Sequence, residues 1–188
     1  EASRGTSGMG GVRLSFALSD WAYLGSVYPP ALYALNNLSA GHRKKILEGK
    51  SDFGVFQEYA AINEYINKNE ETVETFLEIE KKYPETAKSY YPLMKELLVG
   101  QGQIEAVARN ANDPIYEYEN LRNQREYSLS QLRSGSSYYN LKSINAEFER
   151  RVNDLVEITL KIGMKDEAEE IERRAAAYIK GNLLRKYN

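Results

Sequence analysis

The sequence contains no cysteine and only one histidine, His42. Disulfides and thiolate metal sites are therefore excluded, and so is a metal site built from several histidines. Catalytic motifs are missing as well, because there is no glycine-rich phosphate loop after a strand, no nucleophile elbow and no Glu-x-x-His pair for a di-iron centre. We therefore predict a protein that is not an enzyme and that carries no cofactor and no metal.

Neither sign of charge is in clear excess. The 188 residues include 25 Lys and Arg against 27 Asp and Glu, which gives a net charge of −2. Proteins that bind nucleic acid usually carry a basic excess, so we predict no nucleic-acid partner. The densest basic stretch, Arg43, Lys44 and Lys45, could meet an acidic partner or a phosphate, although a solvated helix end is the simpler explanation.

Charge is also scarce in the first forty residues. A glycine-rich opening is followed by an apolar and aromatic run over residues 12–28, and Pro29-Pro30 then imposes an extended or turning path. We predict that residues 1–40 form an extended, largely uncharged N-terminal arm that precedes a helical domain over residues 41–188. Two interpretations stay open, because the segment could lie on a partner or pack back on its own bundle.

Aromatic side chains dominate the energies of protein interfaces, and they are the expected anchors of such an arm. The predicted partner-binding residues are Phe16, Trp21, Tyr23 and Tyr28, together with Arg43, Lys44 and Lys45. Residues 21–41 are uncharged and long enough to cross a bilayer. Because prolines, asparagines and serines interrupt them, we predict a protein that is peripheral to a membrane rather than spanning it.

After residue 50, apolar residues recur with the period of an α-helix. We expect a second layer that is kinked at Pro92 or split at Asp113-Pro114, where Asp113 can cap a helix and Pro114 can begin it. The fold class that follows is an all-α, up-down four-helix bundle. Its four layers are expected at 52–82, at 84–111 together with 114–133, at 138–162 and at 164–186.

The clearest pattern is a helical hairpin near the C-terminus. Phe148 and Leu155 lie on the apolar stripe of its first helix, and Gly163 is suited to the left-handed position that ends a helix. Gly163 alone joins the helices expected at 138–162 and 164–186, and so short a connection makes them antiparallel. Arg125 lies on the apolar face of the preceding segment, so its charged head must reach the edge of that face or be paired. No motif returns at a spacing of 34 residues, so we expect no helical solenoid.

The C-terminal helices resemble the extrinsic PsbQ-type proteins of photosystem II. The features that carry the resemblance are a helix ending in Ser128–Arg133, a small-residue linker, a helix built like Glu147-Phe148 to Leu155, and a final helix with Ala168, Ala175, Tyr178 and Leu183. The resemblance covers about residues 110–188. The chain differs from the family in Pro92 and in its glycine-rich opening.

The resemblance implies a non-catalytic extrinsic subunit in the thylakoid lumen, peripheral to the membrane. Such a subunit would dock on the lumenal side of photosystem II and stabilise the oxygen-evolving complex by retaining its calcium and chloride. The partner would be a large protein complex, either a membrane-protein core or its neighbouring subunits. The alternatives are a structural coat or filament subunit whose N-terminal arm threads into neighbouring copies, and a stand-alone helical adaptor.

Overall fold

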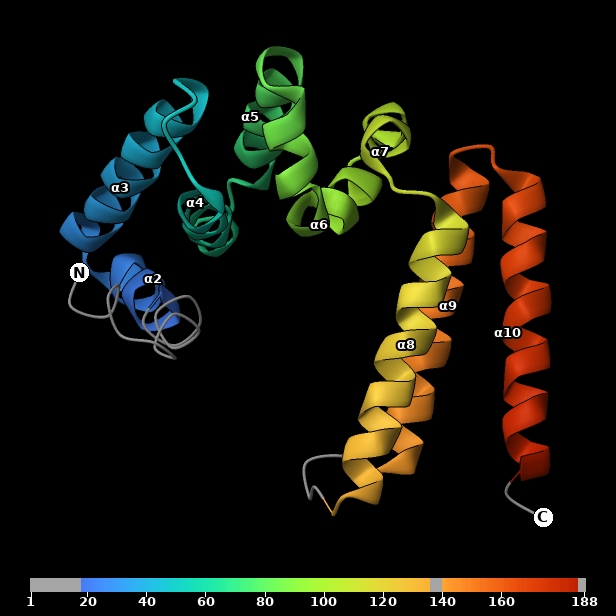
Figure 1. Ribbon diagram of the computed structural model, residues 1–188. Helices are drawn as coiled ribbons and strands as arrows, with labels where there is room; N and C mark the ends of the chain where they lie inside the picture. The colour runs from blue at the N-terminus through green and yellow to red at the C-terminus, as the bar shows by residue number, and fades with distance from the viewer. Residues whose placement is uncertain (1–17, 136–139, 186–188) are drawn as a thin grey trace. The chain divides into compact units, whose positions relative to one another are not determined.

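The computed structural model describes residues 18–135 and 140–185, with side chains up to residue 180. This part of the chain forms nine helices and no strand, so the predicted all-α class is confirmed. The helices are α2 (Leu18–Val27), α3 (Pro29–Leu47), α4 (Phe53–Tyr65), α5 (Asn69–Lys82), α6 (Pro84–Gly100), α7 (Ile104–Asn110), α8 (Pro114–Arg133), α9 (Leu141–Lys161) and α10 (Lys165–Arg185) (Figure 1).

The helices belong to two compact units, one ending at Ala106 and the other beginning at Val107. In the first unit each helix from α2 to α5 packs on the next helix, and α2, α3 and α4 also pack on the next but one. Packing of each helix on its neighbours in sequence is common to helical bundles and helical solenoids. The stretch expected as one layer, residues 84–111 with 114–133, is divided between the two units, so the described helices do not form the single four-layer bundle expected from the sequence.

Residues 18–27 and 29–40 are helical, so the expected extended path is wrong for this stretch. Tyr28 is the extended residue between two helices (φ −130°, ψ 94°), and Pro29 then occupies the first turn of α3. Proline suits that position because a first-turn N–H has no partner within the helix. The boundary predicted after residue 40 lies inside α3. The glycine-rich opening falls outside the described residues.

The inner faces of α2 and α3 belong to a hydrophobic core. Leu18 and Leu35 are buried with Ile62 of α4, and Trp21 packs against this cluster. Polar contacts fix the same arrangement, because the Ser39 hydroxyl donates to Asn63 Oδ1 at 2.6 Å. Asn63 Nδ2 in turn donates to Thr72 Oγ1 of α5 at 2.9 Å. Buried polar groups demand partners, so these bonds set the register of α3, α4 and α5.

Several helix boundaries follow the predicted turn chemistry. The Asp113 carboxylate accepts hydrogen bonds from the backbone N–H groups of Ile115 and Tyr116 at 2.7 and 3.2 Å, and Pro114 begins α8. The layer expected over 52–82 is broken into α4 and α5 at Asn67, which has the left-handed φ of 57°. Pro92 lies inside α6 and does not end it. No new helix begins at Pro92, whereas the split at Asp113 is confirmed.

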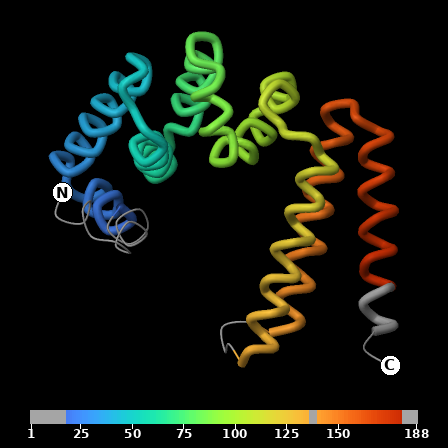
Figure 2. Tube along the Cα trace, viewed as in Figure 1, coloured from blue at the N-terminus to red at the C-terminus, as the bar shows by residue number. Residues whose placement is uncertain are grey.

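The second unit contains the predicted hairpin. Gly163 ends α9 with φ 84°, and the short connection turns the chain into α10 (Figure 2). Phe148 and Leu155 are buried as expected. The core of this unit consists of Tyr118, Phe148, Val152, Leu155, Val156, Ala168, Ile171 and Ala175.

Three tyrosines should make stability depend on alkaline pH. Burial raises the pKa of the Tyr59, Tyr118 and Tyr178 phenols above the usual value. Folding then favours the protonated phenols. Their contribution to stability is fully present below the unfolded pKa of about 10 and is lost as the pH rises through the raised folded values.

We therefore expect the urea midpoint to decrease above about pH 10. Tyr59→Phe should make this decrease shallower, whereas Tyr116→Phe, at an exposed position, should leave it unchanged. Urea titrations from neutral to alkaline pH would test this. The same pH dependence in the Tyr59→Phe protein would show that this phenol makes no contribution.

Candidate docking surface

Helix α2 carries large apolar side chains on two opposite faces, with Asp20 on the outer one. Its inner face carries Leu18, Trp21, Ala22 and Gly25, whose spacings of three and four place them on one side. This face packs on α3 and α4. A helix that is hydrophobic all round is normally buried all round. The outer face of α2 is therefore the feature of this unit that most needs an explanation.

The outer face of α2 continues across the turn onto the first residues of α3. We call this surface the hairpin face, after the turn between α2 and α3 and not after the C-terminal hairpin of α9 and α10. Its large side chains are at least 40% exposed. They are Tyr23 (75%), Leu24 (46%), Val27 (68%), Tyr28 (54%), Leu32 (40%) and Tyr33 (70%). A tyrosine side chain contributes about 150–250 Å² of surface, so the three tyrosines alone expose on the order of 400 Å². The largest apolar patch on a typical monomer is about 300–600 Å² and is often functional, so this surface is a candidate interaction site.

The turn holds the two helices close together. The Tyr28 N–H donates to the Leu24 carbonyl at 2.7 Å, which closes the end of α2. A Cβ atom placed on Gly25 would lie 3.2 Å from both the backbone nitrogen and the Cβ of Leu32. Gly25 therefore permits an approach that a larger residue would obstruct, and it brings Leu32 beside α2. The turn therefore holds the exposed side chains of α2 close to those at the start of α3.

The aromatic residues predicted to bind a partner lie in different places. Tyr23 and Tyr28 are on the hairpin face. Trp21 is half-buried and packs against the core of Leu18, Leu35 and Ile62. Phe16 lies outside the described residues. Leu24, Val27, Leu32 and Tyr33 were not predicted from the sequence as members of this surface. Their helical spacing to Tyr23 and Tyr28 could have indicated that they share a face with these tyrosines.

The basic cluster lies toward the other end of α3. Fifteen residues separate Pro29 from Lys44, which corresponds to about 22 Å along a helix. Arg43 points inward, where its Nε donates to Thr75 Oγ1 at 3.0 Å and its Nη2 lies 3.2 Å from Glu78 Oε1. Lys44 and Lys45 are exposed in the last turn, where cations favour the helix dipole. The structure therefore does not bring the basic cluster together with the aromatic residues.

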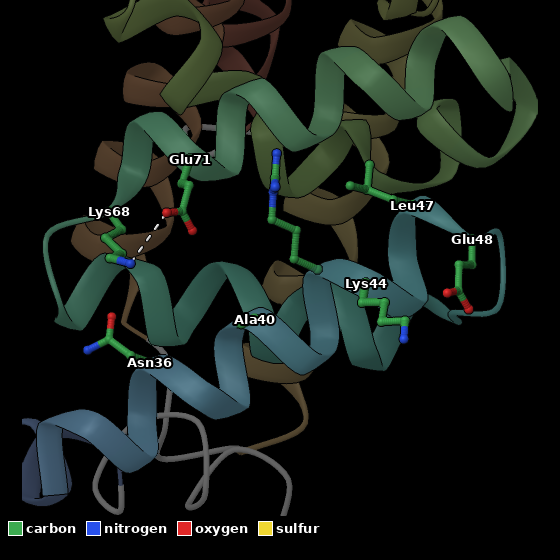
Figure 3. Close-up of a pocket in the computed structure, with 8 residues that line it drawn as sticks. Asn36, Ala40, Lys44, Leu47, Glu48, Lys68 and Glu71 are labelled. Carbon is green, nitrogen blue, oxygen red and sulfur yellow. Dashed lines mark hydrogen bonds and ion pairs between the residues drawn. The ribbon is translucent and has the colours of Figure 1, made fainter. Parts of the chain in front are cut away.

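A groove of about 460 Å³ lies between α3 and α5. In Figure 3, Lys68 and Glu71 lie toward one end of it, and Lys44 and Glu48 lie toward the other. Lys68 pairs with Glu71 at 3.3 Å, and Glu48 pairs with Lys50 at 2.9 Å. Most charges around the groove are therefore already paired within the protein, which makes it a poor site for a charged ligand.

The sole histidine is buried beside an acid. His42 is 2% exposed, and its Nε2 lies 3.4 Å from Glu58 Oε2. Over residues 18–135 and 140–180, no three acidic or histidine side chains are gathered closely enough to hold a metal ion. Within the described helices, none is both long and apolar enough to cross a bilayer.

Comparison with known proteins finds no matching family model, no similar curated protein and no similar solved structure.

Proposed function

We propose that this protein is a non-catalytic subunit that docks through the hairpin face onto a larger protein assembly. The observation that carries the proposal is the second apolar face of α2, which no described residue covers. Tyrosine is enriched in protein interfaces because its ring provides apolar area and its hydroxyl can remain hydrated at the rim.

The charge distribution favours a partner surface that is itself apolar and weakly charged. Asp20 is the only charged residue between residues 18 and 40, and it lies in the first turn of α2. Asp20 lies three, four and seven residues before Tyr23, Leu24 and Val27, so it is on the same side of α2. A highly charged partner surface would lose hydration on this face and find only this one carboxylate to pair with, which is unfavourable. The hairpin face therefore suits a protein partner better than an acidic lipid surface or a nucleic acid.

The extrinsic-subunit role implied by the resemblance is a specific form of this proposal. In that form the assembly is photosystem II, the docking site lies on its lumenal side, and the subunit stabilises the oxygen-evolving complex. Three antiparallel helices of the kind found in such bundles are present as α8, α9 and α10. Rebinding to salt-washed thylakoid membranes tests this specific form. Failure to rebind would remove photosystem II as the partner.

The general proposal is tested by a tyrosine pair with a matched control. Tyr23→Ala with Tyr33→Ala removes two exposed rings from the hairpin face, and Tyr116→Ala with Tyr127→Ala removes two rings of α8 that are also more than 60% exposed. Expressed in the source organism, the control variant should elute with the native assembly in size-exclusion chromatography. The Tyr23/Tyr33 variant should elute as a free chain, because losing two interface aromatics weakens binding by about 100-fold or more.

Two outcomes would contradict the proposal. One is unchanged assembly of the Tyr23/Tyr33 variant. The other is an assembly that contains only copies of this chain, which would instead support the coat or filament subunit. Both tyrosine pairs are exposed, so neither change should alter the free energy of unfolding by more than about 0.5 kcal/mol.

A further inference from the structure

Arg125 is a buried cation in the second unit. Only 9% of it is exposed. Its Nη1 donates to the Tyr178 hydroxyl at 2.9 Å and its Nη2 donates to Asn145 Oδ1 at 2.7 Å. The guanidinium also lies 5.5 Å from the ring centre of Phe148. Arg125 therefore satisfies the sequence prediction that its head must be paired, but its partners are neutral.

The pairing of Arg125 is incomplete. Its Nε–H is buried without a hydrogen-bond partner, and no carboxylate of the described residues forms an ion pair with it. Its hydrogen-bond link to a carboxylate is indirect, because the Tyr178 hydroxyl that accepts from Arg125 donates in turn to Glu126. A carboxylate forms stronger hydrogen bonds with a guanidinium than a neutral oxygen does. The site thus retains unused capacity for an anion.

Arg125 lines a groove of about 360 Å³ between α8 and α9. The groove combines an apolar surface from Leu121, Ile144 and Phe148 with hydroxyl groups from Ser128 and Ser143. Sites for small molecules have this composition, in which an apolar lining fixes the body of the ligand and a few polar groups orient it.

The remaining charged groups of the groove leave a positive excess. Arg151 is a second arginine in the lining, and its Nη1 donates to the neutral Gln124 Oε1 at 2.5 Å. Glu147 is the single carboxylate of the lining. Arg150 donates to both oxygens of Glu147, and this bonding lowers the pKa of Glu147. Glu147 is therefore hydrogen-bonded to Arg150, and it acts on Arg151 only electrostatically. Neither Arg125 nor Arg151 donates a hydrogen bond to a carboxylate of the described residues.

We propose that this groove binds a small organic acid with one carboxylate and an apolar body. The carboxylate pairs with Arg125 and Arg151, and the apolar body lies on Leu121, Ile144 and Phe148. This site is in the second unit and is separate from the hairpin face. Its existence does not depend on the proposed docking function, and either proposal can fail without the other.

The test uses hexanoate as the probe and hexanamide as its neutral counterpart. Titration of the full chain labelled with ¹⁵N should give saturable shifts at the groove-lining positions of α8 and α9 with hexanoate. Hexanamide should bind at least about tenfold more weakly, because it cannot form charge-assisted bonds. Arg151→Gln should weaken hexanoate binding by a similar factor without emptying the core, since Arg151 is only half-buried.

Arg173→Gln is the matched control. It makes the same change of charge on an exposed part of α10 outside the groove, so hexanoate binding should change less than about twofold. The proposal is overturned if hexanoate gives no saturable shift, if hexanamide binds equally well, or if Arg173→Gln weakens binding as much as Arg151→Gln does.

Discussion

Replacing Leu35 by alanine should destabilise the first unit by about 2–5 kcal/mol, the usual cost of emptying a buried leucine site. Leu35 is 1% exposed and packs with Leu18 and Ile62. Its position in α3 makes the substitution a test of whether this part of the chain belongs to the core. In an extended arm the same change would have little effect on the free energy of unfolding.

The same helix provides a control for Leu35→Ala. Leu32 is three residues earlier and is 40% exposed on the hairpin face. Leu32→Ala should therefore cost less than about 1 kcal/mol. The single tryptophan, Trp21, packs on the Leu18–Leu35–Ile62 core, so its fluorescence reports unfolding of this unit during a urea titration. Equal midpoints for the two variants would mean that Leu35 is not a core residue.

Replacing Phe148 by alanine should be the most damaging single change in the second unit, at about 3–5 kcal/mol. Phe148 is 4% exposed, and its ring packs edge-on against Tyr178 with ring centres 5.6 Å apart. The substitution removes this contact and also the ring beside the Arg125 guanidinium. Leu155→Ala, at a position equally buried on the same stripe, should cost about 2–5 kcal/mol.

The control for Phe148→Ala is Leu160→Ala. Leu160 belongs to the same helix but is 49% exposed, so its truncation should cost less than about 1 kcal/mol. Amide exchange of α9 measures the stability of this unit separately from the first. Protection factors that remain unchanged in the Phe148→Ala protein would contradict the assignment of this stripe to the core.

The second unit was largely predictable because its sequence signals are local and agree with one another. Asp113 and Pro114 begin a helix by their own chemistry, and Gly163 ends one. Phe148 and Leu155 stand among charged neighbours, so the apolar stripe of α9 is easily distinguished from its solvated side. Such agreement between local signals and tertiary packing makes periodicity informative.

The N-terminal helices were not predictable by the same reasoning. Charge marks the solvated face of most helices, but α2 carries only Asp20, so both of its faces look alike in the sequence. What decides between an extended arm and packed helices is tertiary packing. The approach of Leu32 to Gly25 and the burial of Leu35 against Ile62 depend on residues that the turn and the stacking bring together.

In both candidate sites, the type of residue was predictable from the sequence but its position in the fold was not. Tyr23 and Tyr28 were recognisable as interface residues by type, but only the fold separates them from Trp21, which packs inward. Arg125 was recognisable as a cation on an apolar face. Its neutral partners, Tyr178 and Asn145, come from helices that no local pattern places beside it.

The most direct test of the docking claim is photo-cross-linking from the hairpin face within the native assembly. Benzoylphenylalanine replaces Tyr23 in one protein and Tyr127 of α8 in the control, since both positions are exposed. We predict that position 23 cross-links to a different protein chain of the assembly and that position 127 does not. Cross-links from position 23 only to this chain or to a second copy of it would contradict the account.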